Sequence, residues 1–206
     1  MMHRKLKVEE LHRLDLPEYR KAEPMPLTVV LDNVRSLYNV GSVLRTADAY
    51  HVCEVWLCGI TCAPKDGVKQ ESATDGTHSF FETRAGEGLL REIHKTALGA
   101  ELSVASRYFG DTKAAIQALK EQGYTVLAVE QAEQSLSLPD FRPEKEKKYA
   151  VVFGHEVKGV QQEVIDASDG CLELPQYGTK HSLNVSVTAG IVIWHFARHF
   201  YPGLNG

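Results

Sequence analysis

Short apolar runs alternate with amphipathic stretches along most of the chain. The apolar runs predict strands at residues 27–31, 54–58, 124–129, 149–153 and 171–174, with weaker candidates at 79–83 and 102–104. The stretches between them predict helices over 39–50, from residue 91, over 111–122, over 161–167 and over 182–200. This alternation favours an α/β fold, a mainly parallel sheet with helices on both faces.

The two ends of the chain have different patterns. Residues 3–20 place leucines among many charges and predict one amphipathic helix that Pro17 ends. The helix over 182–200 is apolar nearly all round, which indicates burial against something large. We therefore divide the chain into an N-terminal helical extension, 1–26, and one domain, 27–206.

Composition narrows the class of protein. A run of about 18 apolar residues is missing, and the basic N-terminus lacks the apolar stretch of a signal peptide, so we expect a cytoplasmic protein with no membrane partner. The net charge of −4 argues against non-specific coating of nucleic acid, although a local basic face is compatible with an RNA substrate. His195 and His199 have no evident third ligand, so we expect no metal site.

Polar loops follow four of the predicted strands, at 32–39, 130–135, 154–159 and 175–182. In parallel sheets, ligands bind where such loops meet. Asn39, Gly41 and Arg45 open the first helix, where an arginine can hold a phosphate, but a helix cap and a surface arginine explain them equally well. Glu156 follows Gly154 and either binds a ribose or a ligand amine or is an ordinary surface residue. Ser182 and Asn184 begin the last helix, as ligand contacts or ordinary caps.

Taken together and in this order, the three blocks resemble the SpoU/TrmH branch of the SPOUT RNA methyltransferases. Asn39, Gly41 and Arg45 are similar to the opening motif of that family. The middle motif resembles Gly154, Glu156 and Gly159, and the closing motif resembles Pro175, Gly178, Ser182, Leu183 and Asn184. The resemblance extends from about residue 27 to residue 198, and residues 95–100 and 123–131 are similar to stretches of its tRNA-acting members.

The resemblance implies a C-terminal part tied in a deep trefoil knot, a rare exception to the usual connection rules. It implies an enzyme that transfers methyl from S-adenosylmethionine to a ribose 2′-hydroxyl of RNA, with tRNA and its D-loop guanosine as the favoured target. The implied cofactor-binding residues are Val129, Glu130, Gln131, Phe153, Gly154, Glu156, Leu174, Pro175, Gln176, Gly178, Ser182 and Leu183. The implied catalytic residues are Arg45, which would grip a phosphate and polarise the hydroxyl, with Asn39, Glu156, Ser182 and Asn184 around it.

The resemblance also implies a homodimer through the C-terminal helix, with site residues from both subunits. Candidate RNA-binding residues are Arg4, Lys5, Arg13, Arg35 and Arg45, for which solvated surface is an equal alternative. Residues near 65–90 form an insertion relative to the family, either inert or in contact with RNA. Alternatives are the same reaction on ribosomal RNA, a non-catalytic RNA-binding relative, and an unrelated nucleotide-binding α/β protein.

Overall fold

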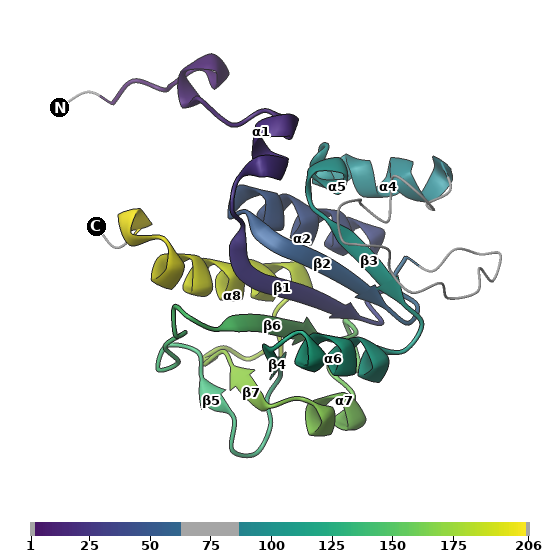
Figure 1. The fold of residues 1–206 in the computed structure, drawn as a ribbon. Coiled ribbons are helices and arrows are strands. Elements are labelled where there is room, and N and C mark those ends of the chain that lie inside the picture. The colour runs from purple at the N-terminus through teal and green to yellow at the C-terminus, as the bar shows by residue number, and fades with distance from the viewer. Residues whose placement is uncertain (1–2, 63–86, 205–206) are drawn as a thin grey trace.

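A single parallel sheet organises the part of the chain that the computed structural model describes, residues 3–62 and 87–204. Its strand order is β3-β2-β1-β6-β4-β7-β5 (Figure 1). The strands are β1 (Met25–Asp32), β2 (Val52–Cys58), β3 (Ser106–Phe109), β4 (Tyr124–Val129), β5 (Leu136–Ser137), β6 (Lys148–Phe153) and β7 (Gly170–Glu173). Every strand pair is parallel, as the alternation of strands and helices predicts.

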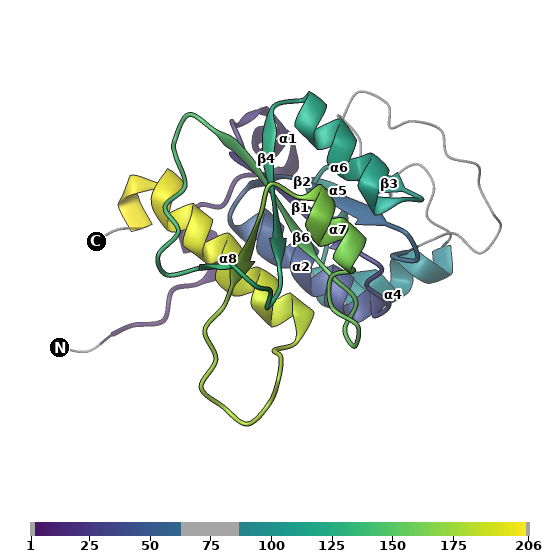
Figure 2. The same cartoon turned by 90° about the horizontal axis from the view of Figure 1, so that it is seen from below.

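Helices cover both faces of the sheet (Figure 2). One face carries α2 (Leu37–Ala49), α4 (Glu87–Ala97), α5 (Ala100–Ser103) and α8 (Val185–Phe200), and the other carries α6 (Thr112–Glu121) and α7 (Gln162–Ala167). Shorter elements lie at the ends: η1 (Val8–Leu11), α1 (Leu16–Lys21) and η2 (Pro202–Leu204). Successive residues of a strand point to opposite faces, so Val29 packs toward α2 and α8 while Val30 packs toward α6. The predicted α/β class is thus confirmed.

Two predictions of secondary structure are wrong. Residues 102–104 were expected as a strand, but α5 covers most of them, and the edge strand β3 begins at Ser106 instead. The expected single helix over 3–20 is two short helices, because Pro17 lies in the first turn of α1, where proline is tolerated, rather than at a helix end. Asp15 and Glu18 form the capping box that begins α1. The strand candidate at 79–83 lies outside the described residues, as does most of the insertion near 65–90.

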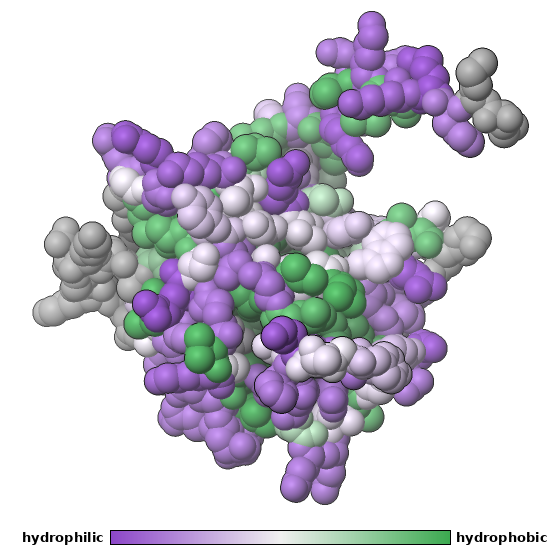
Figure 3. Space-filling model, turned by 180° about the vertical axis from the view of Figure 1, so that it is seen from behind, coloured by the Kyte–Doolittle hydropathy of each residue, from purple (hydrophilic) through white to green (hydrophobic). Residues whose placement is uncertain are grey.

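The last helix, α8, is buried along one side only. Ala189, Val192, Ile193 and Phe196 are fully buried against the sheet. An apolar stripe on its opposite side remains exposed, and Figure 3 shows hydrophobic residues gathered on this face of the molecule. The stripe consists of Val187, Ile191 and Trp194 on α8, together with Leu183 just before the helix, and these residues are 38–51% exposed. None of the described helices is both long and apolar enough to cross a membrane.

In the middle of the sheet, two strands that are far apart in the sequence lie side by side. Strand β1 pairs with β2 on one side and with the much later β6 on the other. The loops that follow β1 and β6 therefore meet at the carboxyl edge of the sheet, with the loop after β4 beside them. A point where the strand order reverses in this way is where parallel sheets bind ligands.

Candidate functional site

The carboxylate of Glu156, in the loop after β6, joins that loop to the beginning of α2. Its Oε2 accepts a hydrogen bond from the Arg35 amide at 3.1 Å, and its Oε1 accepts from the Ser36 amide at 2.9 Å. Oε1 also accepts from the Asn39 side-chain Nδ2 at 3.1 Å. These donors lie at the N-terminus of a helix, where the helix dipole favours a negative charge. The carboxylate thus fixes two loops that are more than a hundred residues apart in sequence.

Asn39 extends this connection to the third predicted block. Its Oδ1 accepts a hydrogen bond from the Asn184 Nδ2 at 3.1 Å. The Oδ1 of Asn184 accepts from the Ser186 amide at 2.8 Å and so caps α8. The predicted residues Asn39, Glu156 and Asn184, one from each block, therefore form a continuous chain of hydrogen bonds, although the sequence offered capping as an equal explanation for two of them.

The hydrogen bonds to Glu156 determine its ionisation. Partial burial raises the pKa of this carboxyl, but the bonds from the Ser36 and Arg35 amides, its own amide and Asn39 outweigh burial and leave the pKa lowered. Glu156 is therefore ionised at neutral pH and is a weak base. Its chemistry is that of a fixed acceptor that holds donors in place rather than that of a proton carrier.

Thr61 fixes the loop after β1 through two hydrogen bonds, and this role was not predicted from the sequence. Its hydroxyl accepts a hydrogen bond from the Val34 amide at 2.8 Å and donates to the Leu31 carbonyl at 3.0 Å. The side chain is fully buried. Val34 directly precedes the two amides that hold Glu156, so Thr61 sets the position of those donors. A lone threonine after a strand carries no signal that would have identified it.

A cavity of about 430 Å³ opens beside Glu156 at the carboxyl ends of β4, β6 and β7. Ten of the twelve residues predicted to bind cofactor line it: Val129, Glu130, Gln131, Phe153, Gly154, Glu156, Leu174, Gln176, Ser182 and Leu183. The other two, Pro175 and Gly178, are exposed in the same loop but do not line the cavity. We name this space the first cavity. His155, Lys158 and His181 also line it and were not predicted.

Close backbone contacts shape one wall of the first cavity. A Cβ on Gly154 would lie 2.2 Å from the carbonyl carbon of Gly159, so only glycine permits this approach. Gly159 has a φ of +67°, and its neighbour Val160 donates its amide to Glu130 Oε2 at 2.9 Å. The Oε1 of Glu130 accepts from the Gln131 amide at 2.9 Å. The Glu130 carboxylate is therefore occupied in joining the loops after β4 and β6.

The loop after β7 forms the opposite wall and is held at one point. The Gln131 Nε2 donates to the His181 carbonyl at 2.6 Å. The backbone of residues 175–180 makes no hydrogen bond to any described residue. The cavity thus combines apolar walls, such as Phe153 and Leu174, with free backbone groups and a few charges. This combination is typical of a small-molecule site, and the volume lies within the usual range for one.

Of the predicted catalytic residues, Glu156 and Ser182 line the first cavity, and hydrogen bonds join Asn39 and Asn184 to Glu156. Arg45 lies apart from them. It is exposed on α2, six residues after Asn39, and lines a different cavity beside the N-terminal segment. Six residues correspond to about 9 Å along a helix and to faces roughly 120° apart. Within one chain, then, Arg45 is not grouped with Asn39, Glu156, Ser182 and Asn184.

Gly41 lies between these two parts of α2 and permits close packing against α4. A Cβ at this position would lie 2.2 Å from Thr96 Oγ1 and 2.5 Å from the Ile93 carbonyl oxygen. The groups that approach Gly41 closely are therefore the Thr96 hydroxyl and the backbone of α4. Thr96 also donates to the Tyr38 carbonyl at 3.0 Å, which ties α4 to the beginning of α2.

Four predicted RNA-binding residues besides Arg45 are also exposed: Arg4, Lys5, Arg13 and Arg35. Arg4 is paired with Glu10 at 2.8 Å, and the Arg35 amide holds Glu156. Arg13 lines the same cavity as Arg45. His195, set aside as a metal ligand, bonds the Phe141 carbonyl through Nε2 at 2.9 Å.

Comparisons with known proteins identify relatives of this chain. The model of the SpoU rRNA Methylase family matches residues 79–194. Over 190 residues the chain is 32% identical to a tRNA (guanosine(18)-2′-O)-methyltransferase of Thermus thermophilus, which covers 92% of this chain and 83% of the relative.

Two solved structures share the fold. One is a TrmH/SpoU tRNA modifying enzyme from A. aeolicus, at 23% identity and a TM-score of 0.68, covering 91% of this chain and 82% of that one. The other is an AdoMet-bound rRNA methyltransferase from Sinorhizobium meliloti, at 22% identity and a TM-score of 0.66, covering 88% of this chain and 60% of that one.

Proposed function

This chain belongs to the SpoU/TrmH family of RNA 2′-O-ribose methyltransferases, which use S-adenosylmethionine, and we propose that its substrate is a guanosine of tRNA. Family membership implies the knotted SPOUT fold predicted from the sequence. The choice of tRNA rests on the 32% identity to an enzyme named for guanosine 18 of tRNA. Ribosomal RNA is the second candidate, because relatives of both kinds occur in the family.

The residues of the first cavity fit the cofactor. When bound, S-adenosylmethionine supplies an electrophilic methyl group on a sulfonium. Apolar side chains such as Val129, Phe153 and Leu183 suit its adenine ring, and the free backbone of residues 175–180 offers donors and acceptors for its polar groups. Glu156, ionised at the rim, adds a negative charge near a cationic ligand.

The chain of hydrogen bonds through Glu156 is the observation that carries the proposal. It places the amide groups of Asn39 and Asn184 beside the first cavity. Such fixed polar groups can orient a ribose, since the incoming hydroxyl must approach the methyl group in line. The Arg45 guanidinium stays protonated, so its proposed role is to grip a phosphate and polarise the 2′-hydroxyl rather than to remove its proton.

The separation of Arg45 from the first cavity supports a homodimer in which each active site draws on both subunits. Transfer of the methyl group requires Arg45 and the cofactor at one place, which a single chain does not provide. The exposed stripe of Leu183, Val187, Ile191 and Trp194 on α8 offers an apolar surface for the partner. A two-fold dimer would bury the same stripe on both copies.

Mixing two inactive variants tests this arrangement. Arg45→Ala removes the guanidinium, and Ser182→Trp fills the first cavity from an exposed position at its edge. Each variant alone is expected to lose methyl transfer, by about 10²–10³-fold for the arginine. After unfolding and refolding together, half of the dimers are mixed and each has one complete site, so about a quarter of the wild-type activity returns. No recovery would show that Arg45 acts within its own subunit.

The substrate is tested with labelled S-adenosylmethionine and defined RNAs. We expect label in a tRNA transcript, on a guanosine, and none after that nucleotide is replaced by its 2′-deoxy form. Transfer to ribosomal RNA fragments alone would overturn the choice of tRNA. Absence of transfer to any RNA, with S-adenosylmethionine still bound in calorimetry, would favour a non-catalytic relative.

A further inference from the structure

A second cavity, of about 600 Å³, lies between the N-terminal segment and the helices α2 and α5. The N-terminal segment contributes Arg13, Leu14, Asp15, Leu16 and Tyr19, and α2 contributes Arg45 and Asp48. The connection between α4 and α5 supplies Leu98 and Gly99, and α5 adds Ala100, Leu102 and Ser103. The size is that of a small-molecule site, and the walls come from segments far apart in sequence.

The charged side chains of the second cavity differ in whether they already have hydrogen-bond partners within the protein. Asp15 accepts from the Glu18 amide at 2.8 Å, and Asp48 accepts from the Ser103 hydroxyl at 2.5 Å. Neither guanidinium, of Arg13 or of Arg45, has a hydrogen bond or ion pair with any described residue. The carboxylates therefore serve the structure, while two cations remain available to an anionic ligand.

Apolar groups line the rest of the cavity and are partly open to solvent. Leu14, Leu16, Leu98 and Leu102 are 40–59% exposed. The ring of His51 lies 4.2 Å from that of Tyr19, and burial lowers the pKa of the histidine, so it adds no charge at neutral pH. Two free guanidiniums beside an apolar wall match a phosphate next to a flat heterocycle.

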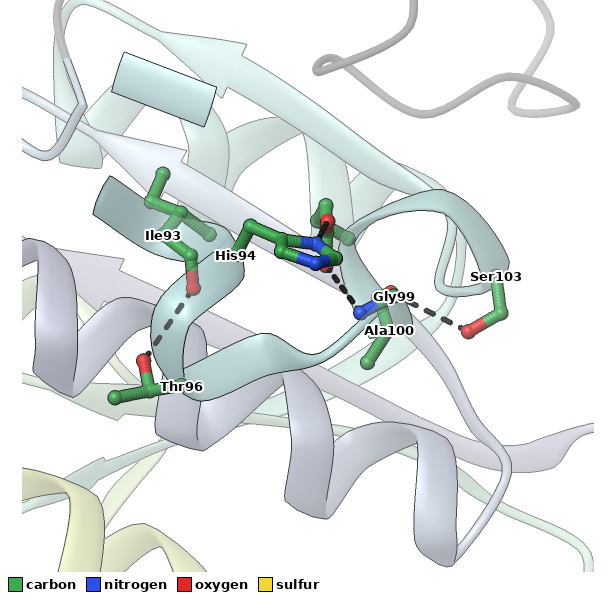
Figure 4. A network of polar contacts seen from close by, with 7 residues as sticks. Ile93, His94, Thr96, Gly99, Ala100 and Ser103 are labelled. Carbon is green, nitrogen blue, oxygen red and sulfur yellow. Dashed lines mark hydrogen bonds and ion pairs between the residues drawn. The ribbon is translucent and has the colours of Figure 1, made fainter. Parts of the chain in front are cut away.

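The wall formed by α5 and the connection that precedes it is held in a fixed shape. The buried carboxylate of Glu101 accepts from the Gly99 amide at 2.9 Å and contacts His94 Nδ1 at 2.5 Å, and Figure 4 shows His94 and Gly99 together in this network. The N-terminal segment is tied to the same wall, because Arg20 donates to the Leu102 carbonyl at 2.8 Å. The cavity is therefore present before any ligand binds, which lowers the cost of ordering on binding.

We propose that the second cavity binds one nucleotide of the RNA substrate, with its phosphate between Arg13 and Arg45 and its base on the apolar wall. The inference rests on the proposed function and adds the N-terminal segment to the RNA site. RNA is favoured over a free nucleotide because the chain belongs to a family of RNA methyltransferases and residues of the N-terminal segment line the cavity together with Arg45.

Arg13→Ala is the direct test, with Arg91→Ala as the matched control, because Arg91 is exposed on α4 outside the cavity. Binding of a tRNA transcript is measured at several salt concentrations, together with KM for RNA and calorimetric binding of S-adenosylmethionine. For Arg13→Ala we expect Kd and KM for RNA to rise about tenfold, and the slope of log K against log salt to fall by about 0.7–0.9. Binding of S-adenosylmethionine should not change.

A second variant tests the apolar wall. Leu98→Glu places a negative charge on an exposed side chain of the cavity, so the fold should be retained while RNA binding weakens at least tenfold. Equal effects of Arg13→Ala and Arg91→Ala, or an unchanged salt slope in Arg13→Ala, would overturn the inference. Transfer of methyl to RNA in that case would leave the proposed function standing. RNA binding that depends on Arg13, without any methyl transfer, would instead support the second cavity as an RNA site and overturn the proposed function.

Discussion

The two cavities are built by opposite means. The first is closed by hydrogen bonds between loops: Glu130 and Glu156 each accept two amides or more, and Gln131 reaches across to the His181 carbonyl. The second has an apolar wall and two arginines without partners among the described residues. Charges used to shape a site are satisfied within the protein, whereas charges kept for a ligand are left open.

Helix α2 connects the two cavities. Its first turn carries Asn39, which donates to Glu156 of the first cavity, and its later turns carry Arg45, which lines the second. Gly41 lies between them, against α4. The position of this one helix therefore sets the positions of both Asn39 and Arg45. A substitution that moves α2 should affect ligand binding at both cavities, while a substitution in a single loop should affect only one.

The largest effect is expected from Gly41→Ala. The added Cβ would overlap Thr96 Oγ1 and the Ile93 carbonyl, and the latter cannot move without moving α4. We expect a loss of about 2 kcal/mol of unfolding free energy in urea, typical of overpacking, together with weaker binding of both S-adenosylmethionine and RNA. The control is Gly88→Ala, also in a helix, where a Cβ meets no atom within 4 Å. Equal stability of the two variants would contradict the close contact.

A smaller and more local effect is expected from Thr61→Val. The substitution keeps the shape of the side chain but leaves the buried Val34 amide without an acceptor, at a cost of about 1–2 kcal/mol in unfolding free energy. Because Val34 precedes the donors to Glu156, affinity for S-adenosylmethionine should fall, while binding of RNA to the second cavity should not. Thr61→Ser keeps the hydroxyl and should restore cofactor affinity. Failure of serine to do so would mean that the methyl group, not the hydroxyl, matters.

The smallest effect concerns the charge of Glu156. Its pKa is lowered from 4.5, so the stabilisation by its charge is fully present above that pH and is lost as the pH falls through the lowered value. Glu156→Gln removes this dependence. The difference in unfolding free energy between wild type and variant should be constant from pH 7 to about 5 and should shrink at lower pH. A difference that grows on acidification would contradict the hydrogen bonds assigned to the carboxylate.

The sequence predicted the central strands well because each is a short, fully apolar run between polar loops, as at residues 124–129 and 149–153. It failed where an element is only a few residues long, because so short a pattern does not distinguish a strand from a helical turn. Residues 102–104 resemble a strand, yet the buried Glu101 holds the Gly99 amide and begins a helical turn there. In the N-terminal segment the capping box of Asp15 and Glu18 was present in the sequence, and Pro17 was read as an end instead of a beginning.

Candidate site residues could be named from the sequence, but which of them lie close together could not. Motif order placed Asn39, Glu156 and Asn184 in strand-end loops, and the reversal of strand order at β1 and β6 brings such loops together. The separation of Arg45 from Asn39 depends on the angle between their faces of α2. The role of Thr61 depends on a hydrogen bond to a loop 27 residues earlier, and no local pattern reveals it.

Glu156 accepts hydrogen bonds from two kinds of donor, which differ in how easily a mutation removes them. The amides of Arg35 and Ser36 belong to the main chain, and nearly any replacement of Arg35 preserves its N–H. The Asn39 amide is a side chain that a single mutation removes. Over evolutionary time the side chain at position 35 is therefore free to vary, while Asn39 is constrained by its hydrogen bond to Glu156.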